Sequence, residues 1–194
     1  MVLIFVISDV ICQLSLPAGT SYTQNFDAIS TGLPSGWSVR TGASASSRGT
    51  ATTFTNTVGT NRWASATGAF SNMASSEGLL ENASSTEQDY SIDRVPAIRQ
   101  TGSFGDPGAA FELVIVNTIN RINFSLNITH QMLSVQPRST TWLVQYSTNG
   151  GTSWSTLNTY TDPGSFGATN SGSLSFGSAL NNLSSTVYIR IVAL

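Results

Sequence analysis

The chain has 194 residues, of which 40% are hydrophobic and only 9% are charged, and its formal net charge is −2. Its eight basic residues are all arginines and form no cluster, which argues against a nucleic-acid partner and an anionic membrane surface, because both are bound through basic patches. Ser, Thr and Asn dominate the polar positions, and these residues favour strands and turns over helices.

The first residues contain an apolar run, Val2 to Ile7, which is typical of a secretion signal and too short to span a bilayer. We interpret residues 1–12 as a signal peptide with a truncated or misassigned start and cleavage after Cys12, and we expect a secreted or cell-surface protein without membrane insertion. An ordinary first strand is the alternative. Cleavage would leave residues 13–194 as a single domain without cysteine, whose stability depends on its core.

Patterns in the first half are short. Residues 21–28 alternate between larger and smaller or polar side chains, and a turn at 33–36 precedes a short strand through Trp37 and Val39.

The next stretch is poorer in large apolar groups. Residues 41–59 predict a surface loop with an edge strand near 50–54, and residues 61–67 are compatible with another strand. Residues 75–93 hold five acids with little periodicity, which favours a loop with one helical turn at 77–81.

Alternation is far more regular in the second half. Strands are predicted at 109–116, 121–132, 141–147 and 187–194. The residues expected to face inward are Phe111, Leu113, Ile115, Ile122, Phe124, Leu126, Ile128, Trp142, Val144 and Tyr146. Side chains two apart share a face of a strand, so the pattern predicts an all-β fold, a two-sheet antiparallel β-sandwich of jelly-roll type.

The last segment, 187–194, is apolar on both sides except for Arg190, as in a central strand. The chain ends within this run, from which we expect a missing final strand.

The strongest local signal is YSTNGGTSW at 146–154, where Asn149-Gly150 predicts a tight β-hairpin. Residues 147–154 resemble the Asp-box, S-x-D-x-G-x-T-W, with Asn149 in place of the acid. The resemblance implies a structural hairpin in which Trp154 packs the turn against the sheet.

His130 is the only histidine, and it lies in phase with the inward residues of 121–132. A catalytic triad or a histidine metal cluster would need more, so we interpret it as a hydrogen-bonded histidine at the end of a sheet. Glu87-Gln88-Asp89 begins like the ExDxxE strand of laminarinase-type jelly-roll hydrolases, but position 92 is Ile. We therefore expect no catalytic residues.

Two weak binding sites remain. Asp27, with Asn25 and loop carbonyls, could bind calcium at the sandwich edge. Four tryptophans could include a platform that stacks on sugar rings, and Trp63, in a polar stretch, is the best candidate for exposure. Trp142 alternates with the core and is expected to be buried, and core filling is the interpretation that we favour for the tryptophans.

Several short motifs along the chain resemble the secreted jelly-roll domains of large bacterial surface proteins, which are distant relatives of MAM and concanavalin-like domains. They are YTQNFD and LPSGW near the start, Asp93-Arg94, WLVQYSTNGGTSW and the final VYIRIVAL. The resemblance implies extracellular attachment or ligand binding, alongside other domains of a larger chain, and a further strand with paired aspartates after the last one.

We therefore expect a non-catalytic extracellular module for adhesion or carbohydrate binding, with a polysaccharide or cell-surface glycan as partner. One alternative is a structural subunit of a surface layer or fibre that assembles by strand exchange at the last strand. The other is a glycoside hydrolase-like enzyme using the acids at 77–93.

Overall fold

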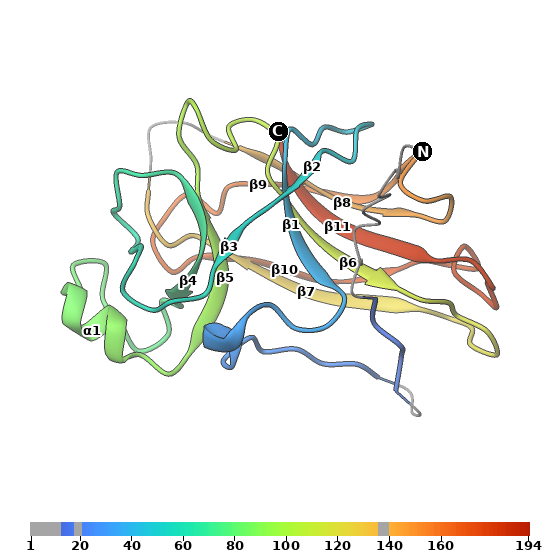
Figure 1. Cartoon of the computed structure of the whole chain (residues 1–194), viewed down its shortest axis with the longest axis horizontal. Coiled ribbons are helices and arrows are strands. Elements are labelled where there is room, and N and C mark those ends of the chain that lie inside the picture. Colours follow the sequence, from blue (N-terminus) through green and yellow to red (C-terminus); the bar gives the residue numbers. More distant parts are fainter. Residues whose placement is uncertain (1–12, 18–20, 136–139) are drawn as a thin grey trace, which may run out of the picture.

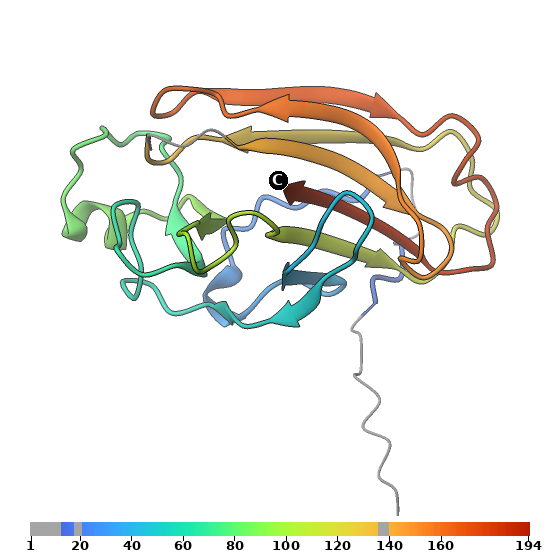
Figure 2. The same cartoon turned by 90° about the horizontal axis from the view of Figure 1, so that it is seen from above.

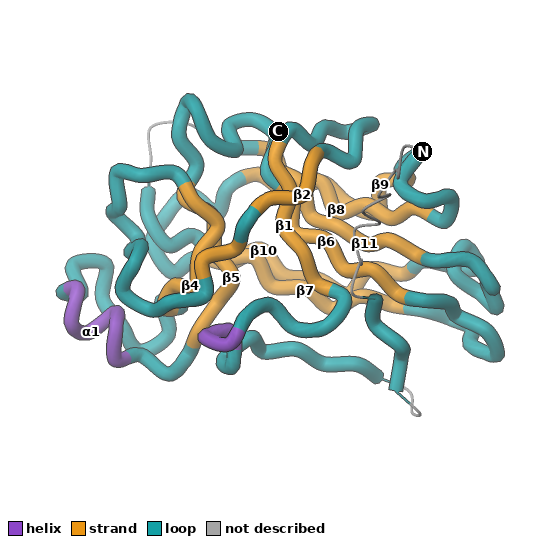
Figure 3. Tube along the Cα trace, in the orientation of Figure 1, coloured by secondary structure: helices purple, strands orange, loops and turns teal. Residues whose placement is uncertain are grey.

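The computed structural model describes residues 13–17, 21–135 and 140–194, so the predicted signal peptide lies outside the described residues. Within these ranges the chain is mostly β, with eleven strands, one short α-helix and one 3-10 turn (Figures 1 and 3). This confirms the predicted all-β class with largely antiparallel sheets. In Figures 1 and 2 the long strands of the second half lie side by side, and α1 lies beyond them at one end.

The largest sheet has six strands, all antiparallel to their neighbours, in the order β2–β1–β6–β11–β8–β9. Their bounds are β2 Thr50–Thr52, β1 Trp37–Thr41, β6 Ala110–Ile115, β11 Val187–Ala193, β8 Thr141–Ser147 and β9 Ser155–Thr161. The predictions for 37–39, 109–116, 141–147 and the edge strand near 50–54 are thereby confirmed.

Two smaller sheets contain the remaining strands, in the orders β3–β4–β5 and β10–β7. Their bounds are β3 Phe54–Thr55, β4 Ala69–Ala74, β5 Arg94–Arg99, β7 Ser125–Gln131 and β10 Thr169–Ser175. Among the pairings between these described strands, the two-residue pairing of β3 with β4 alone is parallel. The 3-10 turn η1 is Ile29–Thr31 and the helix α1 is Ser85–Tyr90.

The main core lies between the six-stranded sheet and the small sheets. One buried cluster joins Leu113, Ile115 and Val187 of the large sheet with Leu126 of β7 and with Phe176 after β10. A second cluster joins the large sheet to the three-stranded one. Its members are Val39, Phe70, Ala109, Trp142 and Ala193, with partly buried neighbours that include Phe54, Ile98 and Phe111.

Strand β11 lies between β6 and β8 and pairs with both. This confirms the prediction of a central strand for the apolar run 187–194. Both edges of β11 are hydrogen-bonded, so an incoming strand cannot add directly beside it, and assembly by strand exchange elsewhere stays a prediction.

The outer face of the six-stranded sheet carries a buried polar network that the sequence pattern did not predict. Glu112 is fully buried and accepts hydrogen bonds from Arg40 and Arg48 at 2.7–3.2 Å. Arg190 donates to Gln145 and to carbonyl oxygens of the loop 42–49, which covers this face. A central strand thus tolerates an arginine because each of the three side-chain nitrogens donates a hydrogen bond.

The hairpin at 146–154 is confirmed, with a longer connection than the predicted two-residue turn. The strands end at Ser147 and restart at Ser155. The Asn149 amide binds Ser147 Oγ and Ser153 across the loop, at 2.8–3.1 Å. Trp154 lies over the guanidinium of Arg190, 3.6 Å from ring centroid to Cζ, so the indole does pack this turn against the sheet.

Three local predictions are wrong. Ile122 is 65% exposed, because Asn120 and Asn123 adopt positive φ and interrupt the alternation before β7 begins at Ser125. Residues 61–67 form turns and not a strand. The helix lies at 85–90 and not at 77–81, because Ser84 and Glu87 form a capping box at its start.

Candidate functional site

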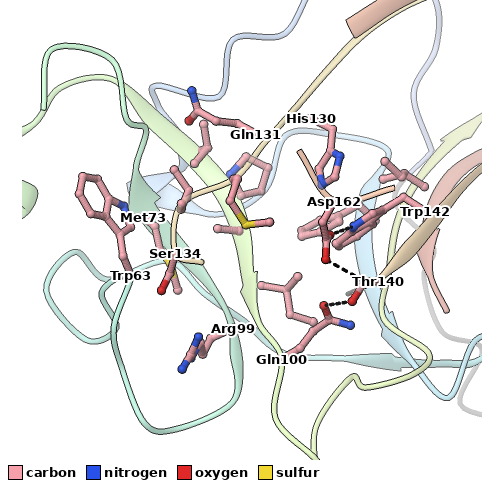
Figure 4. Close-up of a pocket in the computed structure, with 18 of the residues that line it drawn as sticks. Trp63, Met73, Arg99, Gln100, His130, Gln131, Ser134, Thr140, Trp142 and Asp162 are labelled. Atoms are coloured by element: carbon pink, nitrogen blue, oxygen red, sulfur yellow. Dashed lines mark hydrogen bonds between the residues drawn. The ribbon is translucent and has the colours of Figure 1, made fainter. Parts of the chain in front are cut away.

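A cleft of about 490 Å³ lies between β5 and β7, a volume within the range of ligand-binding pockets. Phe111, Trp142 and Ile191 of the six-stranded sheet line it. We call this apolar surface the floor of the cleft. Figure 4 shows Trp63 and Met73 in one part of the cleft and His130 beside Trp142 and Asp162 in another.

The walls of the cleft follow the edges of two strands. Every residue from Val95 to Gly102 lines it on the β5 side, and every residue from Ile128 to Ser134 lines it on the β7 side. If a cavity touched only the face of a strand, alternate residues would line it. The cleft therefore runs along the strand edges, where backbone groups as well as side chains are within reach.

Asp162 fixes the position of the tryptophan at one end of the cleft. Its carboxylate accepts a hydrogen bond from Trp142 Nε1 at 2.8 Å and one from the Thr140 backbone N–H at 2.7 Å. The Thr140 hydroxyl donates in turn to Gln100 Oε1 at 3.5 Å. Both carboxylate oxygens are thus engaged, and one of them fixes the orientation of the Trp142 indole.

His130 projects into the cleft, as its phase within β7 predicted. Its ring packs on Trp142 with centroids 4.5 Å apart and an interplanar angle of 51°. Among the described residues Nδ1 is buried without a hydrogen-bond partner, so the expected bond to this nitrogen is absent there. Burial lowers the pKa of His130 below its ordinary 6.5, against a smaller opposing effect of Asp162, so the ring is neutral at pH 7.

The other groups of the cleft are mostly uncharged hydrogen-bonding side chains. Gln131 Oε1 accepts from the Ser76 N–H at 3.0 Å, which leaves its amide nitrogen available. Arg99 lines the opposite side and donates Nε to the Ser65 carbonyl at 2.8 Å. The apolar floor suits an uncharged part of a ligand, and Arg99, Asp106 and Asp162 are the charged residues of the lining.

Trp63 is buried, with 4% of its surface exposed, so the prediction that it is the exposed tryptophan is wrong. Its indole N–H donates to the Ala74 carbonyl at 2.8 Å, and its ring packs on Phe166 at 4.9 Å. Trp63 nevertheless contributes to the lining of the cleft. Trp142 is buried, as predicted, with 6% exposed.

Asn25 and Asp27 do lie together, and each is hydrogen-bonded within the protein. The Asn25 amide donates to the Asp27 carboxylate, whose other oxygen accepts the backbone N–H of Arg94 at 3.2 Å. No group of three or more His, Cys, Asp or Glu side chains that could hold a metal occurs in the described ranges. Calcium binding there stays a prediction, and Asp27 has a visible structural role at the start of β5.

The acids of 75–93 that could serve hydrolysis have structural partners. Glu87 caps α1 by accepting from the backbone N–H and hydroxyl of Ser84, both at 2.7 Å, and Asp89 pairs with Arg62 at 2.6 Å. Arg94, from the Asp93-Arg94 motif, is buried and donates to Asn72 and to the Gln88 carbonyl at 2.7–2.9 Å. This arginine fastens α1 to β4.

The cleft itself was not predicted from the sequence, because β5 was not recognised. The available signal was the run RVPAIR, whose Val, Ala and Ile suit a strand although Pro96 argues against a central one.

No helix in the part of the chain described here is long and apolar enough to cross a membrane. Comparisons with protein-family models, with curated proteins and with solved structures find no match for this chain.

Proposed function

We propose that this protein is a non-catalytic, extracellular module for adhesion or carbohydrate binding, which holds its ligand in the cleft between β5 and β7. The observation that carries the proposal is a cleft with an apolar floor, a tryptophan held by a hydrogen bond to Asp162 and mostly uncharged polar side chains. The acids nearest to a catalytic role, Asp162, Glu87 and Asp89, are engaged in structural hydrogen bonds or ion pairs.

The proposal includes a two-sheet sandwich of jelly-roll type, as in the secreted bacterial surface domains that the sequence resembles. Its support is the main core, which lies between the six-stranded sheet and the strands β4, β5 and β7. Export is supported by the apolar run at the start of the chain, and an uncharged partner by the scarcity of charged residues.

A glycan array and isothermal titration with cell-wall polysaccharides, run in parallel with binding to intact cells, test the function. Gln131→Ala should weaken binding of any ligand found, because Gln131 lines the cleft. Asn127→Ala is the matched control, since Asn127 is exposed on the same strand and outside the cleft lining. The absence of binding to glycans and to cells would refute the proposal, and equal effects of both variants would place the site elsewhere.

Assembly by strand exchange is the second candidate function. The specific observation in its favour is that β5 and β7 are the end strands of their sheets and border the cleft. The hydrolase alternative has no comparable support. Unchanged turnover of a glycoside substrate after Glu87→Gln and Asp89→Asn would exclude it.

A further inference from the structure

The cleft separates two sheets at their end strands. Among the described strands, β5 pairs only with β4, and β7 pairs only with β10. Each therefore has a second edge on which its backbone groups meet no strand, and the continuous lining of the cleft by both strands shows that these edges border it.

On β5 the direction of the free backbone groups follows from the alternation of an antiparallel strand. Asp93 accepts the Ser75 N–H through its carbonyl on the β4 side, whereas the Arg94 N–H points away and meets Asp27. Residues 96 and 98 share the direction of Arg94. Pro96 has no N–H, so Ile98 presents the first available N–H and C=O pair to the cleft.

On β7 the same rule applies. Met132 exchanges backbone hydrogen bonds with Gly167 and Ala168, and the Phe124 carbonyl accepts from Phe176, all on the β10 side. The register between these two strands shows no shift, so the backbone N–H and C=O groups of the even-numbered residues of β7 point toward β10. Thr129 and Gln131 therefore point their backbone N–H and C=O groups toward the cleft.

We infer that the cleft binds an extended polypeptide segment of a partner protein, which inserts as a strand between β5 and β7. This inference rests on the proposed function, and of its two forms, adhesion and carbohydrate binding, it favours adhesion through a protein partner. With the segment in place, the three strands β3–β4–β5 and the two strands β7–β10 would join through it into one six-stranded sheet, which matches the number of strands in the large sheet.

The surroundings define the chemistry of that segment. Its side chains on one face would pack on the floor of Phe111, Trp142 and Ile191, and on the other face they would meet Trp63 and Leu133. The residues that face the floor, which are alternate residues of the segment, should thus be apolar. Ile98 on one edge, with Thr129 and Gln131 on the other, offers paired backbone N–H and C=O groups that match the backbone of a peptide, whereas a sugar chain lacks such paired groups.

The C-terminus offers a way to supply the segment at high local concentration. Leu194 exchanges backbone hydrogen bonds with Thr141, at 2.8 and 3.3 Å, and Thr140 lines the cleft. A fusion would extend the full chain by a Gly/Ser linker and the six residues Thr-Val-Thr-Ile-Ser-Val. A tether of this kind gives an effective concentration on the order of millimolar. The control fusion carries proline at alternate positions of the segment, which removes its N–H groups along one edge.

Hydrogen exchange of the backbone amides is the measurement. We expect exchange at Ile98, Thr129 and Gln131 to slow by at least about tenfold in the fusion relative to the proline control, the effect of one or two hydrogen bonds. Equal exchange in the two fusions would overturn the inference, and because the host sequence is identical, misfolding could not explain that result.

Two variants locate the effect. Thr129→Pro removes a cleft-facing N–H from an exposed position of β7 and should abolish the protection at Ile98 and Gln131. Ser173→Pro is the matched control, because Ser173 is exposed on β10 and, by the same alternation, points its N–H away from β7. Protection that survives Thr129→Pro would contradict strand insertion.

Free cellohexaose serves as the carbohydrate probe. If it protects the same amides and the fused strand does not, the peptide inference fails while the binding module stands. If the strand protects them while glycan arrays and cell binding are negative, the inference holds and the adhesion proposal fails.

Discussion

Glu112 lies under two arginines on the outer face of the six-stranded sheet, with its side chain fully excluded from solvent. It accepts from Arg40 at 3.0 Å and from Arg48 at 2.7 Å, and the side chains of these arginines are 10% and 19% exposed. Glu112→Gln keeps the volume and removes the charge. Both guanidinium groups then lose their carboxylate partner, although the Arg40 side chain is only 10% exposed and that of Arg48 only 19%.

The expected cost follows from that burial. Removing one partner of a buried ion pair destabilises a protein by about 3–5 kcal/mol. Because Arg48 is partly exposed and can recover some hydration, we expect the lower end, about 3 kcal/mol. With a urea m-value of about 2 kcal/mol/M, the midpoint of unfolding should fall by about 1.5 M.

Urea unfolding followed by tryptophan fluorescence tests this value. Asp89→Asn is the matched control, since Asp89 and Arg62 form an ion pair in which both side chains are 33% exposed. Exposed pairs contribute about 0–1 kcal/mol. The reasoning fails if Glu112→Gln costs no more than Asp89→Asn.

Three further perturbations have defined outcomes. Gly36→Ala should destabilise the protein by about 1–3 kcal/mol more than Gly164→Ala, as measured by thermal unfolding. Both glycines have φ of +85°, but only at Gly36 would the new Cβ lie 2.7 Å from Leu14. Equal losses of stability would contradict this reasoning. Asn149→Ala should cost about 1–2 kcal/mol through its lost hydrogen bonds in the β8–β9 hairpin, and Asn149→Asp should recover part of it in urea unfolding. The pKa of His130 is lowered in the folded protein, so on acidification the unfolded chain binds this proton at a higher pH than the folded one. The free energy of unfolding should therefore decrease as the pH falls below 6.5. His130→Phe should make the urea midpoint less dependent on pH between 7 and 5, and an unchanged pH dependence would refute the assignment.

Regular alternation identified the strands that bury one face. In β6 and β8 apolar residues two positions apart are buried on the same face, as Leu113 and Ile115 are on β6 and Trp142 and Val144 on β8. The signal is local, because the geometry of a strand sends successive side chains to opposite faces whatever its partner is. The resulting prediction of an all-β chain was confirmed.

The strands β4, β5 and β10 escaped prediction for physical reasons. β4 buries Ser71 and Asn72 along with Phe70, so its burial does not follow hydrophobicity. β10 reads TNSGSLS, with Leu174 as its one large apolar residue, and is a strand because it pairs with β7. Neither pattern differs locally from that of a loop.

The cleft depends on these unrecognised elements, so its existence and its walls could not be derived from the sequence. The phase of His130 could be read from the sequence, but the packing of its ring on Trp142 and the hydrogen bond from Trp142 to Asp162 join residues 12 and 20 positions apart. Trp63 shows the converse error. A polar neighbourhood in sequence suggested exposure, whereas Phe166, a hundred residues away, covers the ring.

By itself, the sequence determined that this chain forms strands, which of them bury one face, and where the hairpin at Asn149 turns, because these depend on neighbours within a few positions. The tertiary structure alone decided that Arg190 could be buried beside Gln145 and that β5 and β7 face a shared cleft. Both outcomes require partners distant in the chain, whose hydrogen bonds and strand order no local pattern encodes.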